Sequence, residues 1–176
     1  MNLIAKDSKF SAKEVESIYN QNIKDLFLTE NGEITDQKSD LPIHVIYKGN
    51  EIESYALPVA GYGLWSTLYG YMAMEGDGNT VRGITIYDHK ETPGLGGGCD
   101  KPWFTNQFIG KKITDSNGKF VSVGIVKGKA KDTVSSEDLI NYVDGMSGAT
   151  ITTKGMDEFL REDLSKYEKF SKKLRS

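Results

Sequence analysis

Apolar residues near the start of the chain recur at the three- and four-residue intervals of a helix. The residues that share this spacing are Val15, Ile18, Tyr19, Ile23, Leu26 and Phe27. Ser11 and Glu14 have the spacing of a capping box, and Phe10 lies opposite Val15 as a hydrophobic staple. We therefore expect a helix that begins at Ser11, packs one face against the protein and ends at the polar residues 29–32.

Residues 43–125 change to the alternating pattern of strands, interrupted by turn sequences at residues 49–50, 77–79 and 117–118. The expected strands are residues 43–47, 52–59, 64–74 and 81–87, with Val121, Val123 and Ile125 after the third turn. Such short connections favour an antiparallel sheet. Both faces of residues 64–74 are largely apolar, which predicts a central strand covered on both sides; alternatively, Trp65 beside Gly63 borders a planar ligand.

Helical spacing returns at the C-terminal end of the chain. Its apolar positions are Met156, Phe159, Leu160, Leu164, Tyr167 and Phe170. We expect this helix to start within residues 144–153. The pattern as a whole predicts one α+β domain, an antiparallel or mixed sheet of hairpins flanked by N- and C-terminal helices. Residues 1–40 would form the first helix and its lead-in, and residues 41–176 the core.

Two glycine-containing segments are candidates for a binding site. Residues 91–99 are too rich in glycine for regular structure and precede an expected short helix at 103–109; they lack both standard nucleotide-loop spacings. This loop either admits a flat ligand or is an irregular surface connection. Residues 147–150 place small and hydroxyl side chains before a helix, where free amides suit a phosphate or the side chains simply cap the helix.

Composition removes several function classes. The 176 residues carry a net charge of −3, so no net positive field is available to hold a nucleic acid or an anionic membrane surface. Cys99 is the single cysteine, follows three glycines and could be exposed and oxidisable; His44 and His89 have no evident partner, and no zinc-ligand spacing occurs. No apolar run approaches a membrane span. The residues alone therefore indicate a site for a planar, phosphate-bearing small molecule.

Three motifs together resemble the FMN-binding domain family: GYGLWS at 61–66, ETPGLGG at 91–97 and DGMSGAT at 144–150. This family includes the C subunit of the Na⁺-translocating NADH:quinone reductase, the G subunit of the RNF complex and regulators of the NosR type. Its flavinylation pattern, Asp-Gly-x-Ser/Thr-Gly-Ala-Thr, is met at every position here. The resemblance implies FMN joined through its phosphate to the Thr150 side chain by a Mg²⁺-dependent flavin transferase that takes FMN from FAD.

The resemblance also implies which residues surround the cofactor. Besides Thr150, they are Asp144, Gly145, Ser147, Gly148, Ala149, Trp65, Ser66, Thr67, Glu91, Thr92, Pro93, Gly94, Leu95 and Gly96. We expect Ser147, the amides of 148–149 and a hydroxyl of Thr152 or Thr153 to bind the phosphate, and residues 65–67 and 91–96 to line the flavin ring.

By the same resemblance, the chain is an electron-carrying subunit that passes electrons from an iron–sulfur centre to another flavin, without turnover of its own. Its partners would be the other subunits of the reductase. It would be the periplasmic domain of an inner-membrane protein whose transmembrane anchor is absent from this chain. GLWS favours the reductase branch. The alternatives are an RNF-type or regulatory FMN domain, or a module that binds a phosphate ligand reversibly, with Thr150 only a helix cap.

Overall fold

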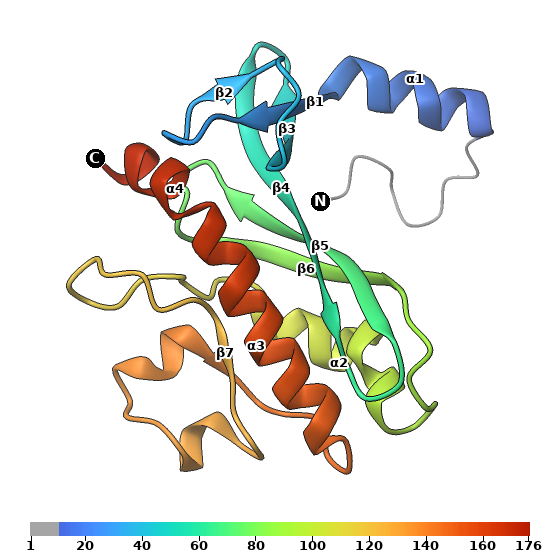
Figure 1. The fold of residues 1–176 in the computed structure, drawn as a ribbon, viewed down its shortest axis with the longest axis vertical. Helices are drawn as coiled ribbons and strands as arrows, with labels where there is room; N and C mark the ends of the chain where they lie inside the picture. Colours follow the sequence, from blue (N-terminus) through green and yellow to red (C-terminus); the bar gives the residue numbers. More distant parts are fainter. Residues whose placement is uncertain (1–10) are drawn as a thin grey trace.

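The structure, a computed structural model, describes residues 11–176. Its centre is a six-stranded sheet in the order β2-β1-β3-β4-β5-β6, in which every neighbouring pair is antiparallel (Figure 1). The strands are β1 (Ile23–Leu28), β2 (Ile34–Thr35), β3 (Pro42–Lys48), β4 (Glu51–Tyr62), β5 (Thr67–Glu75) and β6 (Val81–Asp88). The hairpin turns predicted at residues 49–50 and 77–79 are confirmed, as is the α+β class.

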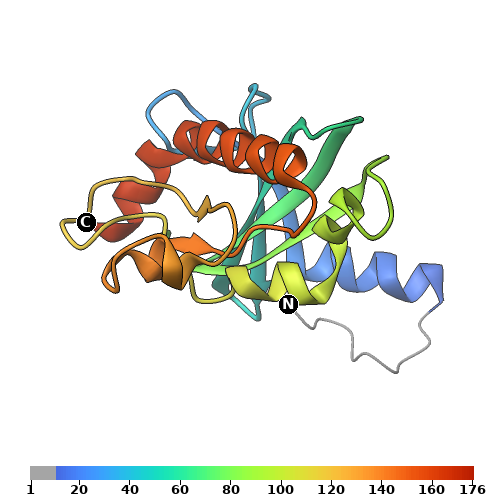
Figure 2. The same cartoon turned by 90° about the horizontal axis from the view of Figure 1, so that it is seen from below.

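Helices lie on both sides of this sheet, with α3 on one side and α1 and α2 on the other (Figure 2). The helices are α1 (Ala12–Asn22), α2 (Pro102–Thr105), α3 (Thr150–Lys166) and α4 (Glu168–Arg175), with 3₁₀ turns η1 (Gly96–Asp100), η2 (Asn106–Phe108), η3 (Ala130–Asp132) and η4 (Asp138–Asn141). Within residues 11–176, no helix is both long and apolar enough to cross a membrane.

The main core lies between the sheet and the C-terminal helices. It includes Val45, Tyr55, Leu57, Val59, Leu68 and Met72 from the sheet and Met156, Phe159, Leu160, Leu164 and Phe170 from the helices. The predicted single C-terminal helix is broken at Tyr167, whose buried phenol donates a hydrogen bond to the Pro42 carbonyl at 2.7 Å. Asp163 accepts a hydrogen bond from the Ala60 amide at 2.8 Å, which ties α3 to β4.

The predicted start of the N-terminal helix is confirmed, but its predicted end is wrong. The Ser11–Glu14 capping box is present, whereas Phe10, the predicted staple, lies outside the described residues. The helix stops at Asn22, and Ile23–Leu28 pairs with β3 as a strand because the sheet supplies hydrogen bonds that override a pattern compatible with either structure. No residue of α1 is buried, so the predicted packed face is also wrong.

Two strand predictions also need correction. β5 begins at Thr67, because residues 63–66 form a turn in which the Gly63 amide donates to the Ser66 carbonyl at 2.9 Å. Its outer face is open at Tyr69 and Tyr71, so this strand is not covered on both sides. The third predicted turn, at 117–118, is present and is closed by an isolated antiparallel bridge between Thr114 and Phe120. Beyond it only β7 (Gly124–Ile125) is a strand, and it pairs in parallel with β8 (Tyr142–Val143). The Ile125 amide is instead bound by Asp157 of α3.

The glycine loop is more ordered than its composition suggests. Residues 96–100 form the 3₁₀ turn η1, and Gly96–Cys99 are buried, contrary to the expectation of no regular structure. Absence of side chains is what allows the burial: a Cβ at Gly98 would lie 2.5 Å from the Trp103 ring. The short helix expected at 103–109 is confirmed as α2 and η2.

Candidate functional site

A pocket of about 330 Å³ lies where the 63–66 turn, the glycine loop and the first turn of α3 meet. These three segments are found at the lower right of Figure 1. Its lining residues are Leu64, Trp65, Glu91, Thr92, Leu95, Gly96, Gly148, Ala149, Thr150, Ile151 and Thr152. The volume lies at the lower end of the range of small-molecule sites. All three motifs singled out in the sequence therefore contribute to one cavity.

Glu91 connects the three walls of this pocket. Its Oε1 accepts hydrogen bonds from the amides of Leu64, Trp65 and Ser66, at 3.1, 2.8 and 3.3 Å, and its Oε2 accepts one from Thr152 Oγ1. Burial opposes ionisation of the carboxyl, but the bonds from Thr152 and the turn amides outweigh it and lower the pKa of Glu91. The carboxylate therefore holds the walls of the pocket together through hydrogen bonds, a role that differs from the predicted contact with the flavin ring.

Glycines allow the three walls to approach one another. A Cβ at Gly63 would lie 2.8 Å from Glu91 Oε1, and one at Gly96 would lie 2.6 Å from Oε2 and 2.5 Å from Thr152 Oγ1. Gly148, with φ of +74°, faces Leu95 of the glycine loop, where a Cβ would come within 2.9 Å of its Cδ2. The missing side chains therefore allow the two loops to pack directly against Glu91, Thr152 and each other.

The start of α3 presents polar groups that have no partner among residues 11–176. Ala149 is the N-cap and makes no side-chain capping bond, so neither Ser147 nor Thr150 acts as the cap that the alternative interpretation required. The Thr150 side chain is exposed, and the amides of residues 150–152 have no protein acceptor within the described chain. Three free amides at the positive end of a helix favour an anion.

The two hydroxyls expected to bind the phosphate form hydrogen bonds within the protein instead. Thr152 Oγ1 donates to Glu91, and Thr153 Oγ1 accepts from the Met146 amide at 3.2 Å. Both residues are buried, so their hydroxyls hold the loop against the helix. The expectation that Thr152 or Thr153 binds the phosphate is therefore not supported by their contacts.

The remaining predicted site residues divide into two groups. Trp65, Thr92, Leu95, Gly96, Gly148 and Ala149 line the cavity together with Thr150 and Glu91. Ser66, Thr67, Pro93, Gly94, Ser147, Asp144 and Gly145 do not line it. Ser66 Oγ accepts from the Lys90 amide at 2.7 Å, and Thr67 begins β5, so both belong to the scaffold.

Asp144 and Gly145, at the start of the 144–150 motif, pack against residues 126–130. Asp144 accepts hydrogen bonds from the Ala130 amide at 2.8 Å and Lys129 Nζ at 3.0 Å. Burial opposes its ionisation, but these contacts lower the pKa of Asp144. A Cβ at Gly145 would clash with the Val126 carbonyl oxygen, so only glycine fits there. Their place in the motif reflects loop packing.

Leu64 and Ile151 are lining residues that the sequence reasoning did not select. Both are exposed apolar side chains at the edge of the cavity. The alternating pattern places Leu64 in a strand, and Ile151 lies between two threonines. The sequence places both residues next to motif residues, but this position alone does not show which way a side chain points.

Other candidate residues have different roles from those expected. His44 has a carboxylate partner after all, with Nδ1 2.6 Å from Asp25 Oδ1, which also accepts from the Tyr19 hydroxyl. His89 Nε2 lies 3.6 Å from Asp100. Cys99 is fully buried rather than exposed, and burial, followed by the charges of neighbouring carboxylates, raises its pKa to about 12. Within residues 11–176, no group of three potential metal ligands occurs.

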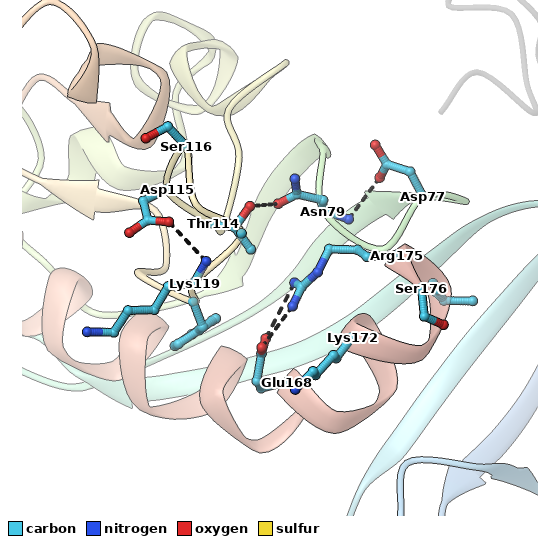
Figure 3. A pocket seen from close by; sticks show the side chains of 13 residues that line it. Asp77, Asn79, Thr114, Asp115, Ser116, Lys119, Glu168, Lys172, Arg175 and Ser176 are labelled. Atoms are coloured by element: carbon cyan, nitrogen blue, oxygen red, sulfur yellow. Dashed lines mark hydrogen bonds and ion pairs between the residues drawn. The ribbon is translucent and has the colours of Figure 1, made fainter.

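A larger hollow, of about 990 Å³, lies beside α4 and contains many charged groups (Figure 3). Arg175 pairs with Glu168 at 2.8 Å, and Asp115 accepts the amides of Asn117 and Lys119 in its own turn. Asp77 likewise accepts the amides of the 77–80 turn. Most of the charged side chains around this hollow therefore already have partners within the protein. The smaller pocket remains the better candidate for a ligand site.

Comparison with known proteins identifies the family of this chain. The family model described as FMN-binding domain matches residues 63–165, more than half of the chain. The C subunit of the Na⁺-translocating NADH-quinone reductase from Pseudomonas aeruginosa is 43% identical over 124 residues, 70% of this chain and 46% of that protein. The same subunit from Vibrio vulnificus is 47% identical over 114 residues, 65% of this chain and 42% of that protein. The chain spans less than half the length of these relatives.

Solved structures agree in fold. The C subunit of the reductase from Parabacteroides distasonis superposes with a TM-score of 0.78 at 38% identity, covering 94% of this chain and 86% of that one. NqrC from Shewanella oneidensis gives the same TM-score at 26% identity, covering 96% of this chain and 91% of that one. The residues matched by the family model contain all of the pocket. The chain belongs to the FMN-binding domain family.

Proposed function

We propose that this chain carries FMN on Thr150 and serves as an electron-relay subunit of a Na⁺-translocating NADH:quinone reductase. The observation that supports it most is the position of Thr150, whose exposed side chain stands beside three unpartnered amides at the mouth of the pocket, within the described residues. The match to the family model supports FMN as the ligand, and the names of the relatives support the complex.

Attachment would use the Thr150 hydroxyl as the nucleophile. Its Oγ forms a bond to the FMN phosphorus of FAD, the bond between that phosphorus and the AMP moiety breaks, and AMP leaves as the hydroxyl proton is lost to solvent. A flavin transferase with Mg²⁺ would catalyse this exchange. The chain would gain one FMN less one water, and the helix start would favour the anionic diester that results.

The residues of this chain bind and orient, while FMN supplies the one- and two-electron chemistry when it is bound. Trp65 and Leu95 stand on different walls of the pocket and fit the faces of a flat ring. Leu64 and Ile151 would exclude water from its edge. Because Thr152 donates a hydrogen bond to Glu91 within the chain itself, the positions of these walls would not depend on the bound cofactor.

The setting of the domain follows from the same proposal. Its partners would be the other subunits of the reductase, including an iron–sulfur donor and a flavin acceptor, and it would sit on the periplasmic side of the inner membrane. A relay domain binds neither NADH nor quinone, so the isolated flavin-bearing chain should accept electrons from a chemical reductant without steady oxidation of NADH.

The test is a reductase complex assembled with variants of this subunit. Thr150→Val should abolish electron transfer from NADH to quinone, whereas Ser116→Ala, an exposed serine outside both the pocket lining and the 144–150 motif, should retain it. Steady NADH oxidation by the isolated chain, or full activity of the Thr150→Val complex, would contradict the proposal.

A further inference from the structure

The 63–66 turn holds a carboxylate from another part of the chain. Its three consecutive amides converge on one oxygen of Glu91, as backbone amides do in anion-binding nests. The contacts join residues 25 to 27 positions apart, and the bond to Thr152 spans 61 positions. One buried side chain thus connects the turn after β4, the glycine loop and α3.

Building on the proposed function, we propose that Glu91 is the positioning residue of the flavin pocket and that its negative charge lowers the reduction potential of the cofactor. It would act without touching the reacting atoms of the ring. The turn carries Trp65 and Leu64, and α3 carries Thr150, so the spacing between the ring-flanking residues and the attachment point depends on this side chain.

The hydrogen bonds of Glu91 explain why it positions rather than binds. Three donors already converge on Oε1, more than its two lone pairs can accept individually, and Thr152 occupies one side of Oε2. Gly63 and Gly96 have no Cβ at the points where one would strike these two oxygens. The surroundings are therefore shaped around this carboxylate.

The charge has its own consequence. A carboxylate on a pocket wall disfavours electrons added nearby, and low local dielectric makes the effect larger than in water. No ion pair within residues 11–176 includes Glu91, so no side-chain cation described there pairs with its charge; Lys154 of α3 pairs instead with Glu158. We expect removal of the charge to favour the reduced flavin about tenfold, which is about 30 mV for a two-electron couple.

Glu91→Gln separates the charge from the geometry. The amide oxygen can still accept from the three turn amides, and the amide nitrogen can donate to Thr152 Oγ1. Glu91→Ala removes both charge and bonds. Asp163→Asn is the matched control, because Asp163 also ties an amide of the sheet to α3, but lies 11 residues further along the helix, about 16 Å from Thr152.

Three measurements test the proposal. Hydrogen exchange of the 64–66 amides in the flavin-free chain should be slow in the wild type and Glu91→Gln and fast in Glu91→Ala. The fraction of chains that acquire flavin from a co-expressed transferase should fall several-fold only in Glu91→Ala. The potential of the loaded protein should rise in Glu91→Gln by the equivalent of about tenfold and stay constant in Asp163→Asn.

Each result decides a separate part. Protected amides and full loading in Glu91→Ala would overturn the positioning role. An unchanged potential in Glu91→Gln would overturn the role of the charge. If even the wild type acquired no flavin, the proposed function would fail, while the exchange rates would still test whether Glu91 orders the turn.

Discussion

Gly96 lies against the hydrogen bond that joins the glycine loop to α3, so Gly96→Ala is a direct test of how that wall is built. The added Cβ would lie 2.5 Å from Thr152 Oγ1, 2.6 Å from Glu91 Oε2 and 3.2 Å from Glu91 Cβ. All three atoms belong to buried side chains. The methyl group therefore has to displace the carboxylate, the hydroxyl or the loop.

Two energies contribute to the expected loss. Insertion of a methyl group into a packed site costs about 1–3 kcal/mol, and weakening a hydrogen bond to a charged group costs about 1.5–3 kcal/mol. We expect the free energy of unfolding to fall by about 3 kcal/mol, which lowers the melting temperature by about 6–12 °C for a chain of this size. Urea unfolding of the flavin-free protein, followed by circular dichroism, measures this change.

Gly83→Ala is the matched control. Gly83 lies within β6 and has no positive φ, and a Cβ added there would meet no atom within 4 Å. Replacement of a strand glycine by alanine should leave stability unchanged or raise it by about 0.5–1 kcal/mol. A Gly96→Ala protein as stable as Gly83→Ala, with flavin loading intact, would refute the packing of this wall.

Two buried ionisable side chains, Cys99 and Glu91, should show their surroundings in their reactivity and their pH dependence. Cys99, with its pKa raised to about 12 by burial, should resist a disulfide reagent at pH 8 in the native protein and react at once in urea; rapid native reaction would contradict its placement. Because hydrogen bonds hold the pKa of Glu91 below the usual 4.5 despite its burial, its contribution to stability is complete above that pH and is lost as the pH falls. The urea midpoint of Glu91→Gln should therefore fall less than that of the wild type between pH 5 and pH 3, and parallel curves would contradict this.

Local chemistry explains what the sequence predicted correctly. The Ser11–Glu14 box and the turns at 49–50 and 77–79 depend on neighbouring residues, so they could be identified without the fold. The end of the first helix could not, because Ile23, Leu26 and Phe27 suit a helix or a strand, and pairing with β3 decides between them.

Long-range contacts explain what the sequence left out. The three motifs indicated a shared pocket, but the hydrogen bond between Glu91 and Thr152 and the contact between Asp25 and His44 join residues far apart in the chain. The three glycines before Cys99 suggested exposure, yet they are what allows the loop to pack inward under Trp103. Side-chain direction at Leu64 and Ile151 likewise required the fold.

The attachment of flavin to Thr150 is tested most directly by the intact mass of the chain after co-expression with a flavin transferase. We expect a gain of one FMN less one water and a yellow colour that survives denaturation, in the wild type and in Ser116→Ala but not in Thr150→Val. A wild-type chain that stays colourless, or that releases its flavin on unfolding, would contradict covalent attachment at this threonine.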